Sequence, residues 1–76
     1  MTAEHFETVI RAFQRRAPFR SYRVELVSGS RVDIDHPEAL VIRNGIAVYL
    51  KGDGTPVFFD HESAAQITDA ASQRAA

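Results

Sequence analysis

Apolar residues near the start of the chain recur with the spacing of an amphipathic helix. Four of them occupy the i, i+3, i+4 and i+7 positions that share one helical face: Phe6, Val9, Ile10 and Phe13. Thr2 is a suitable N-cap, and Pro18 biases the residue before it away from helical geometry. The pattern therefore predicts a helix over residues 3–16.

From Ser21 onward the apolar residues occupy alternate positions instead. Between residues 22 and 34 they are Tyr22, Val24, Leu26, Val32 and Ile34. A period of two is typical of strands with one buried face, and the Ser28-Gly29-Ser30 segment between the two runs favours a turn. We therefore expect a β-hairpin with its apolar face toward a core.

Further along, short apolar runs are separated by turn-forming residues. His36-Pro37 interrupts the second strand, because proline has no N–H for a strand ladder. Asn44-Gly45 favours a two-residue hairpin turn, in which both positions need positive φ. The expected strands cover residues 39–43, 46–50 and 56–60, with a turn over residues 51–55.

The C-terminal part of the chain is less regular. Residues 61–65 favour a single helical turn, and Gln66-Ile67-Thr68 fits either a short closing strand or the last turn of that helix. Residues 70–76 are small and polar, so we expect them to form a frayed tail. The expected organisation is one globular domain over residues 1–69, followed by the tail.

Together these elements predict an α+β fold. One N-terminal helix precedes four or five short antiparallel strands, and a sheet of this kind twists strongly and needs a cover for one face. The apolar stripe of the helix is the natural cover. Closure into a small SH3-like or Sm-like barrel would also remove the sheet edges, so a strongly bent sheet and a barrel both fit the pattern.

Phe58 and Phe59 are neighbours in one expected strand. Successive side chains of a strand point to opposite faces, so one of the two rings has to lie outside the primary core. Exposed aromatic rings often mark interfaces, and a chain of only 76 residues buries little apolar surface alone. We therefore predict self-association through Phe58 and Phe59, with a homodimer as the first expectation. The alternative is that another part of the monomer covers the second ring.

The charges are balanced in number and uneven in position. Nine Lys and Arg residues face ten Asp and Glu residues, so the basic excess typical of nucleic-acid binders is missing. Five arginines nevertheless follow one another with no acidic residue between them: Arg11, Arg15, Arg16, Arg20 and Arg23. This cluster predicts contacts with nucleic-acid phosphates or with an acidic partner. The alternative is a solvated helix face that complements the helix dipole.

Two short segments combine histidine with carboxylates. They are residues 35–38 (Asp-His-Pro-Glu) and residues 60–62 (Asp-His-Glu). If the two segments meet in space, His36, Glu38 and His61 are candidate ligands of a divalent metal. The alternative is that both segments only shape turns, through the proline and through capping side chains.

The remaining composition excludes several classes of function. The chain has no cysteine, no Gly-x-Ser-x-Gly elbow and no glycine-rich phosphate loop. No apolar run reaches the roughly 18 residues of a membrane span, and the first residues lack the pattern of a signal peptide. We expect a cytoplasmic, non-enzymatic binding or structural module that has no cofactor, avoids membranes, self-associates and contacts another protein. Weak nucleic-acid binding and metal binding are the alternatives.

Several motifs follow one another in a distinctive order: a short helix, a Pro18-Phe19 step, an alternating strand that ends at Gly29, and a His36-Pro37-Glu38 motif. This pattern resembles a family of small uncharacterised bacterial proteins. The resemblance covers residues 5 to about 68. It implies the same order of elements and no particular activity.

A looser likeness connects the chain to Sm-like RNA-binding proteins. The order of helix and strands is similar, and residues 24–29 look like the first motif of that group. Residues 59–61 (Phe-Asp-His) are similar in position to the Tyr-Lys-His of its bacterial RNA chaperones. Asp60 stands where those proteins carry a lysine that faces RNA phosphate, and an acid there would repel a phosphate.

Overall fold

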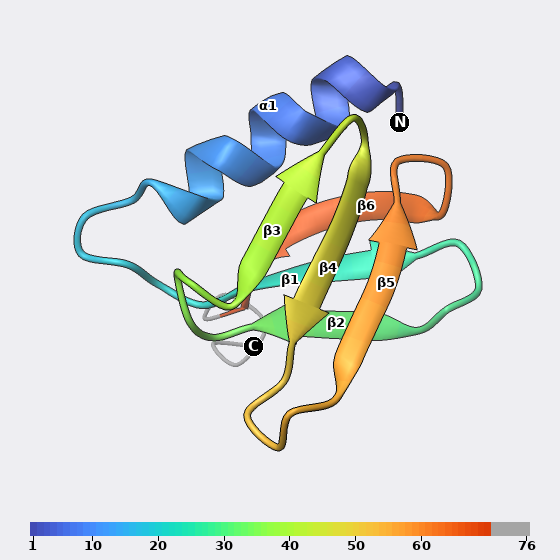
Figure 1. The fold of residues 1–76 in the computed structure, drawn as a ribbon. Coiled ribbons are helices and arrows are strands. Elements are labelled where there is room, and N and C mark those ends of the chain that lie inside the picture. The colour runs from blue at the N-terminus through green and yellow to red at the C-terminus, as the bar shows by residue number, and fades with distance from the viewer. Residues whose placement is uncertain (71–76) are drawn as a thin grey trace.

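The structure is a computed structural model that describes residues 1–70. Within them the chain forms one helix and six strands (Figure 1): α1 (Ala3–Gln14), β1 (Tyr22–Leu26), β2 (Arg31–Ile34), β3 (Leu40–Arg43), β4 (Ile46–Leu50), β5 (Pro56–Asp60) and β6 (Ala64–Asp69). The strands build two antiparallel sheets of three strands each, in the orders β2-β1-β6 and β3-β4-β5. The chain therefore leaves the first sheet after β2 and returns to it with β6.

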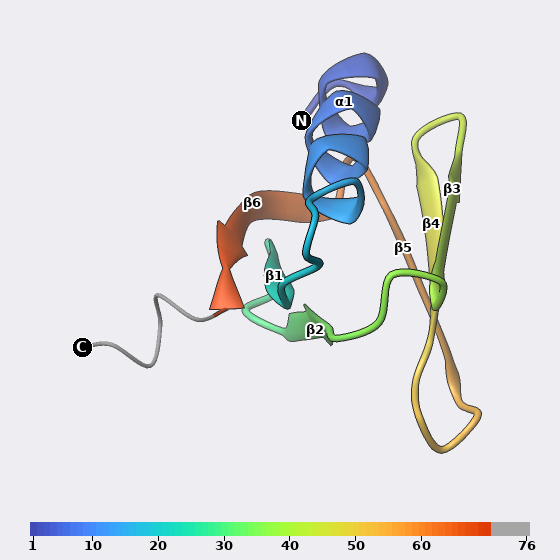
Figure 2. The same ribbon diagram turned by 90° about the vertical axis from the view of Figure 1, so that its left-hand side faces the viewer.

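The two sheets form separate layers, and α1 lies across one end of the space between them (Figure 2). The helix contacts β3 of one sheet and β6 of the other. Its N-terminus is capped as expected, because the side chain of Thr2 accepts a hydrogen bond from the backbone N–H of His5 at 3.1 Å. The helix ends two residues before the predicted residue 16, with Arg15 as the C-cap.

The hydrophobic core lies between the two sheets and under the helix. It contains Phe6, Ile10, Tyr22, Val24, Val32, Ile34, Leu40, Ala47, Tyr49, Phe59 and Ala64. The rings of Phe6 and Phe59 meet edge to face with their centroids 6.0 Å apart, which joins the helix to β5. Each sheet thus contributes to the core the side chains at its inward-facing positions, which alternate with outward-facing ones along each strand.

Each sheet also contributes a tyrosine whose hydroxyl has a partner. The Tyr22 hydroxyl donates to Oε1 of Gln14 at 2.7 Å, and the Tyr49 hydroxyl donates to Oδ1 of Asp35 at 2.7 Å. Burial raises the pKa of both phenols, and the hydrogen bond to Asp35 adds to the rise of the Tyr49 pKa. Both rings can therefore be buried without an unpaired polar group.

The turn between β3 and β4 has the geometry that its sequence predicts. Asn44 and Gly45 both have positive φ, of 54° and 78°, as a two-residue hairpin turn requires. Gly45 is constrained a second time by its neighbours, because a Cβ atom at this position would be too close to other side chains. That atom would lie 2.7 Å from Cδ2 of His61 and 2.8 Å from Cβ of Ala3.

The predicted α+β class is confirmed, and the details of the sheet differ. The described residues form six strands in two sheets instead of one bent sheet of four or five, and the strands do not close into a barrel. The helical turn predicted over residues 61–65 is wrong, because β6 already begins at Ala64 and pairs with β1. The predicted tail at residues 70–76 lies outside the described residues except for Ala70, whose N–H donates to the carbonyl of Ser21.

Candidate interaction surface

The outer face of the β2-β1-β6 sheet is polar in every cross-strand row. The pairing places Arg23 of β1 between Asp33 and Thr68, and it places Glu25 between Arg31 and Gln66. Nε of Arg23 lies 2.6 Å from Oδ1 of Asp33, and Nε2 of Gln66 donates to Oε1 of Glu25 at 2.7 Å. The Asp33 hydrogen bond raises the pKa of Arg23. This face has the composition of a sheet surface that meets water.

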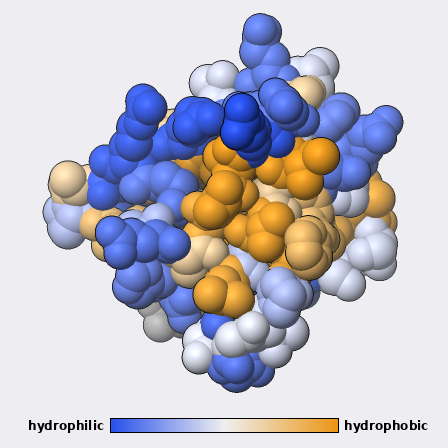
Figure 3. All heavy atoms as spheres, viewed as in Figure 1, coloured by the Kyte–Doolittle hydropathy of each residue, from blue (hydrophilic) through white to orange (hydrophobic). Residues whose placement is uncertain are grey.

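The outer face of the β3-β4-β5 sheet is apolar instead. Its central cross-strand row is Val41, Val48 and Phe58, and Ile46 and Leu50 lie on either side of Val48 along β4. Phe58 is 69% exposed and Val41 is 68% exposed. Figure 3 shows the apolar side chains gathered over these three strands, with hydrophilic groups around them. We refer to Val41, Ile46, Val48, Leu50 and Phe58 as the apolar face.

The inner positions of the same three strands are apolar as well. Leu40, Ala47, Tyr49 and Phe59 point into the core, so both faces of this sheet carry hydrophobic side chains. A signal for this arrangement exists in the sequence, because residues 46–50 (Ile-Ala-Val-Tyr-Leu) contain no polar residue at the outward positions. An uninterrupted apolar strand is typical of a sheet that is covered on both faces. Of the apolar face, sequence reasoning identified Phe58 and missed the other four residues.

Phe58 and Phe59 do point to opposite sides of their strand, as predicted. Phe59 is 5% exposed and lies in the core against Phe6, whereas Phe58 projects from the apolar face. No other part of residues 1–70 covers the Phe58 ring. Because Phe59 is enclosed within the monomer, the predicted self-association surface is centred on Phe58 alone.

One charged residue stands at each edge of the apolar face. Arg43 on β3 and Asp60 on β5 flank Ile46 in the same cross-strand row. Asp60 accepts a hydrogen bond from the backbone N–H of Ser63 at 2.9 Å, which lowers the pKa of the Asp60 carboxyl. Arg43 has no ion-pair partner among residues 1–70.

The five arginines of the predicted basic cluster do not form one free basic patch. Most of them have acidic partners: Arg11 pairs with Glu7, Arg16 and Arg20 with Asp69, and Arg23 with Asp33. Within the described part of the chain, Arg15 has no ion pair. Pairing of this kind reduces the positive charge that the cluster presents to a polyanion.

The two histidine–carboxylate segments lie at opposite ends of the β3-β4-β5 sheet. His36 belongs to the connection from β2 to β3, and His61 belongs to the turn from β5 to β6 (Figure 1). Nδ1 of His36 accepts from the backbone N–H of Glu38 at 3.2 Å, and Nδ1 of His61 lies 2.9 Å from the carbonyl oxygen of Met1. Among residues 1–70 no group of three His, Cys, Asp or Glu side chains could hold a metal ion. The structure therefore does not bring His36, Glu38 and His61 together.

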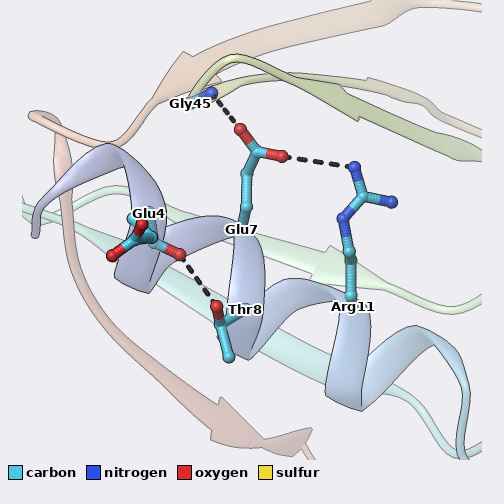
Figure 4. Close-up of polar contacts among 5 residues, drawn as sticks. All are labelled: Glu4, Glu7, Thr8, Arg11 and Gly45. Carbon is cyan, nitrogen blue, oxygen red and sulfur yellow. Dashed lines mark hydrogen bonds and ion pairs between the residues drawn. The ribbon is translucent and has the colours of Figure 1, made fainter.

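A polar junction that sequence reasoning did not identify holds α1 to the β3-β4-β5 sheet (Figure 4). One carboxylate oxygen of Glu7 accepts from the backbone N–H of Gly45 at 2.9 Å, and the other accepts from Nη2 of Arg11 at 3.2 Å. A shallow hollow beside the junction is lined by Ala3, Glu4, Glu7, Thr8, Arg11 and Asn44. Both oxygens of Glu7 already have partners, so this arrangement docks α1 on the β3–β4 turn.

Comparison with known proteins gives no relative from which a function could be transferred. No family model matches the chain, and neither the curated proteins nor the solved structures contain a match. The resemblances to the small bacterial family and to the Sm-like proteins therefore stay predictions. In residues 1–70, α1 is too short and too polar to cross a membrane.

Proposed function

We propose that this chain is a non-enzymatic protein-interaction module whose binding surface is the apolar face. The observation that carries the proposal is the contrast between the outer faces of the two sheets. One sheet meets solvent with paired charged and polar side chains. The other meets it with Val41, Ile46, Leu50 and Phe58, each more than half exposed.

Exposed apolar side chains in one contiguous patch favour association. Burial of apolar surface contributes roughly 25 cal/mol per Å², and a large ring such as Phe58 is the kind of anchor on which interfaces depend. Scattered exposed hydrophobic residues are ordinary on protein surfaces, whereas contiguous patches mark interaction sites. Val41, Val48 and Phe58 are contiguous because they are direct cross-strand neighbours.

The proposal can be tested by photo-crosslinking in the native host. A benzophenone amino acid replaces Phe58, where an aromatic side chain already projects outward. The matched control carries the same group in place of Gln66, an exposed residue on the polar face of the other sheet. We expect discrete protein adducts from position 58 and none from position 66.

The mass of the adducts identifies the partner class. An adduct of twice the chain mass indicates self-association, and an adduct of another discrete mass indicates a different protein. Both results support an interaction surface. Absence of discrete adducts at position 58, or equal adducts at positions 58 and 66, would overturn the proposed function.

A further inference from the structure

We infer that the partner of the apolar face is a second copy of this chain. The two copies pack their β3-β4-β5 sheets face to face around a two-fold axis parallel to β4. The inference rests on the proposed function and adds the identity and the geometry of the partner. Two properties of the face support it: its edge charges and its side-chain sizes.

The apolar face is centred on β4 and has different residues on its two sides. Val48 occupies its centre, with Val41 on the β3 side and Phe58 on the β5 side. A two-fold axis parallel to β4 and above Val48 exchanges the β3 side of one copy with the β5 side of the other. Each residue of β4 then meets its own counterpart, as an isologous interface requires.

The edge charges fit this axis. The exchange places Arg43 of one copy over Asp60 of the second copy, and it repeats the same contact at the opposite edge. Facing sheets pack about 10 Å apart, a distance that an extended arginine and an aspartate can span together. Arg43 has no acidic partner within residues 1–70, so it is available for this pair.

The side-chain sizes fit the same axis. The exposed ring of Phe58 lies over the smaller Val41 of the second copy, so that large and small groups interdigitate. The alternative is a two-fold axis perpendicular to the strands. It gives a worse match, because it places Phe58 of one copy over Phe58 of the other. It also places Arg43 over Ala39 and Asp60 over Pro56, since these residues flank Leu50 in the opposite row. Charges against apolar groups would be desolvated without a partner.

The small size of the face favours weak association. Standard interfaces bury about 800 Å² on each partner, whereas this face spans three strands of only four to five residues. Because small interfaces are typical of weak and transient complexes, we expect a reversible dimer that dissociates on dilution. Sedimentation equilibrium over a concentration series measures this directly.

A size exchange tests the axis. Val41→Phe creates two ring-on-ring contacts in its homodimer, and Phe58→Val creates two gaps in its homodimer, so each variant alone should dimerise at least about tenfold more weakly. An equimolar mixture restores one large and one small group at both contacts. We expect the mixture to form a heterodimer with the affinity of the unmodified chain.

A charge reversal tests the edges. Arg43→Glu places two carboxylates over the two Asp60 side chains and should weaken the dimer about tenfold at low salt, with a smaller effect at high salt. Arg31→Glu is the matched control, because Arg31 lies on the polar face of the other sheet. Circular dichroism checks that every variant retains its fold.

The outcomes separate the inference from the proposed function. A chain that stays monomeric to millimolar concentration overturns the inference, even where position 58 crosslinks to another protein. Single variants that weaken dimerisation without recovery in the mixture overturn the axis. Absence of discrete adducts from position 58 overturns the proposed function as well as the inference.

Discussion

The two outer sheet faces of this molecule have the same architecture and opposite composition. Each belongs to three antiparallel strands that bury their inner side chains in the shared core. On β2-β1-β6 the outward residues satisfy one another, as in the Arg23–Asp33 pair. On β3-β4-β5 the outward residues between the edge charges of Arg43 and Asp60 are mainly valine, isoleucine, leucine and phenylalanine, whose exposure to water is unfavourable.

The comparison shows that the core of the monomer is built from the inner half of the alternating pattern. Both sheets contribute this half, so neither outer face is dictated by the core. The polar face is suited to contact with water. The composition of the apolar face has no explanation within residues 1–70, and the binding of a partner that we propose would supply one.

The largest expected difference in stability is between variants on the inner and the outer side of β5. Phe59→Ala should lower the free energy of unfolding by about 3–5 kcal/mol, because it removes a buried ring that packs against Phe6. Phe58→Ala should lower it by less than about 1 kcal/mol, because that ring already meets solvent. Chemical denaturation at low protein concentration measures both values. Equal losses would contradict the exposure of Phe58.

A smaller loss of stability is expected at the junction between α1 and the β3-β4-β5 sheet. Gly45→Ala should lower the free energy of unfolding by about 2–3 kcal/mol, since it combines positive φ with close contacts to Ala3 and His61. Gly29→Ala is the matched control, because Gly29 has positive φ and open space around it, and it should lose about 1 kcal/mol. Thermal unfolding of the two variants distinguishes crowding from backbone strain. Identical losses would show that the junction at Gly45 is not tightly packed.

The smallest expected effect compares one arginine from each outer face. Arg23→Gln should reduce the melting temperature slightly at low salt and not at high salt, because it breaks an exposed ion pair with Asp33. Arg43→Gln should leave the stability of the monomer unchanged within about 0.5 kcal/mol, since Arg43 has no ion pair within residues 1–70. Scanning calorimetry of dilute protein at two salt concentrations makes the comparison. A clear loss in the Arg43 variant would indicate an intramolecular role.

Local patterns in the sequence predicted most of the elements. The helical spacing from Phe6 to Phe13 located α1 to within two residues, and the bounds of β4 and β5 were predicted correctly. The Asn44-Gly45 turn was predicted from φ preferences alone. The C-terminal region was harder to predict, since residues 61–65 form a short segment without a clear apolar period. The strand that begins at Ala64 depends on pairing with β1.

The candidate surface was only partly accessible from the sequence. Adjacent phenylalanines in a strand guaranteed that one ring would face away from the core, and that ring is Phe58. That Val41, Val48 and Phe58 form one row depends on the register of two hairpins. The pairing of Arg16 with Asp69 joins residues 53 positions apart, and no local pattern signals it.

The sequence by itself therefore determined where the helix and most strands begin and end, which turns need positive φ, and that Phe58 and Phe59 face apart. These properties follow from interactions over a few residues, namely periodicity, capping and backbone preference. Only the tertiary structure decided that the strands divide into two sheets, that most arginines of the basic cluster have acidic partners, and that the apolar face is contiguous. Those outcomes depend on which distant segments pair, and the free energy of such pairing comes from burial across the whole fold.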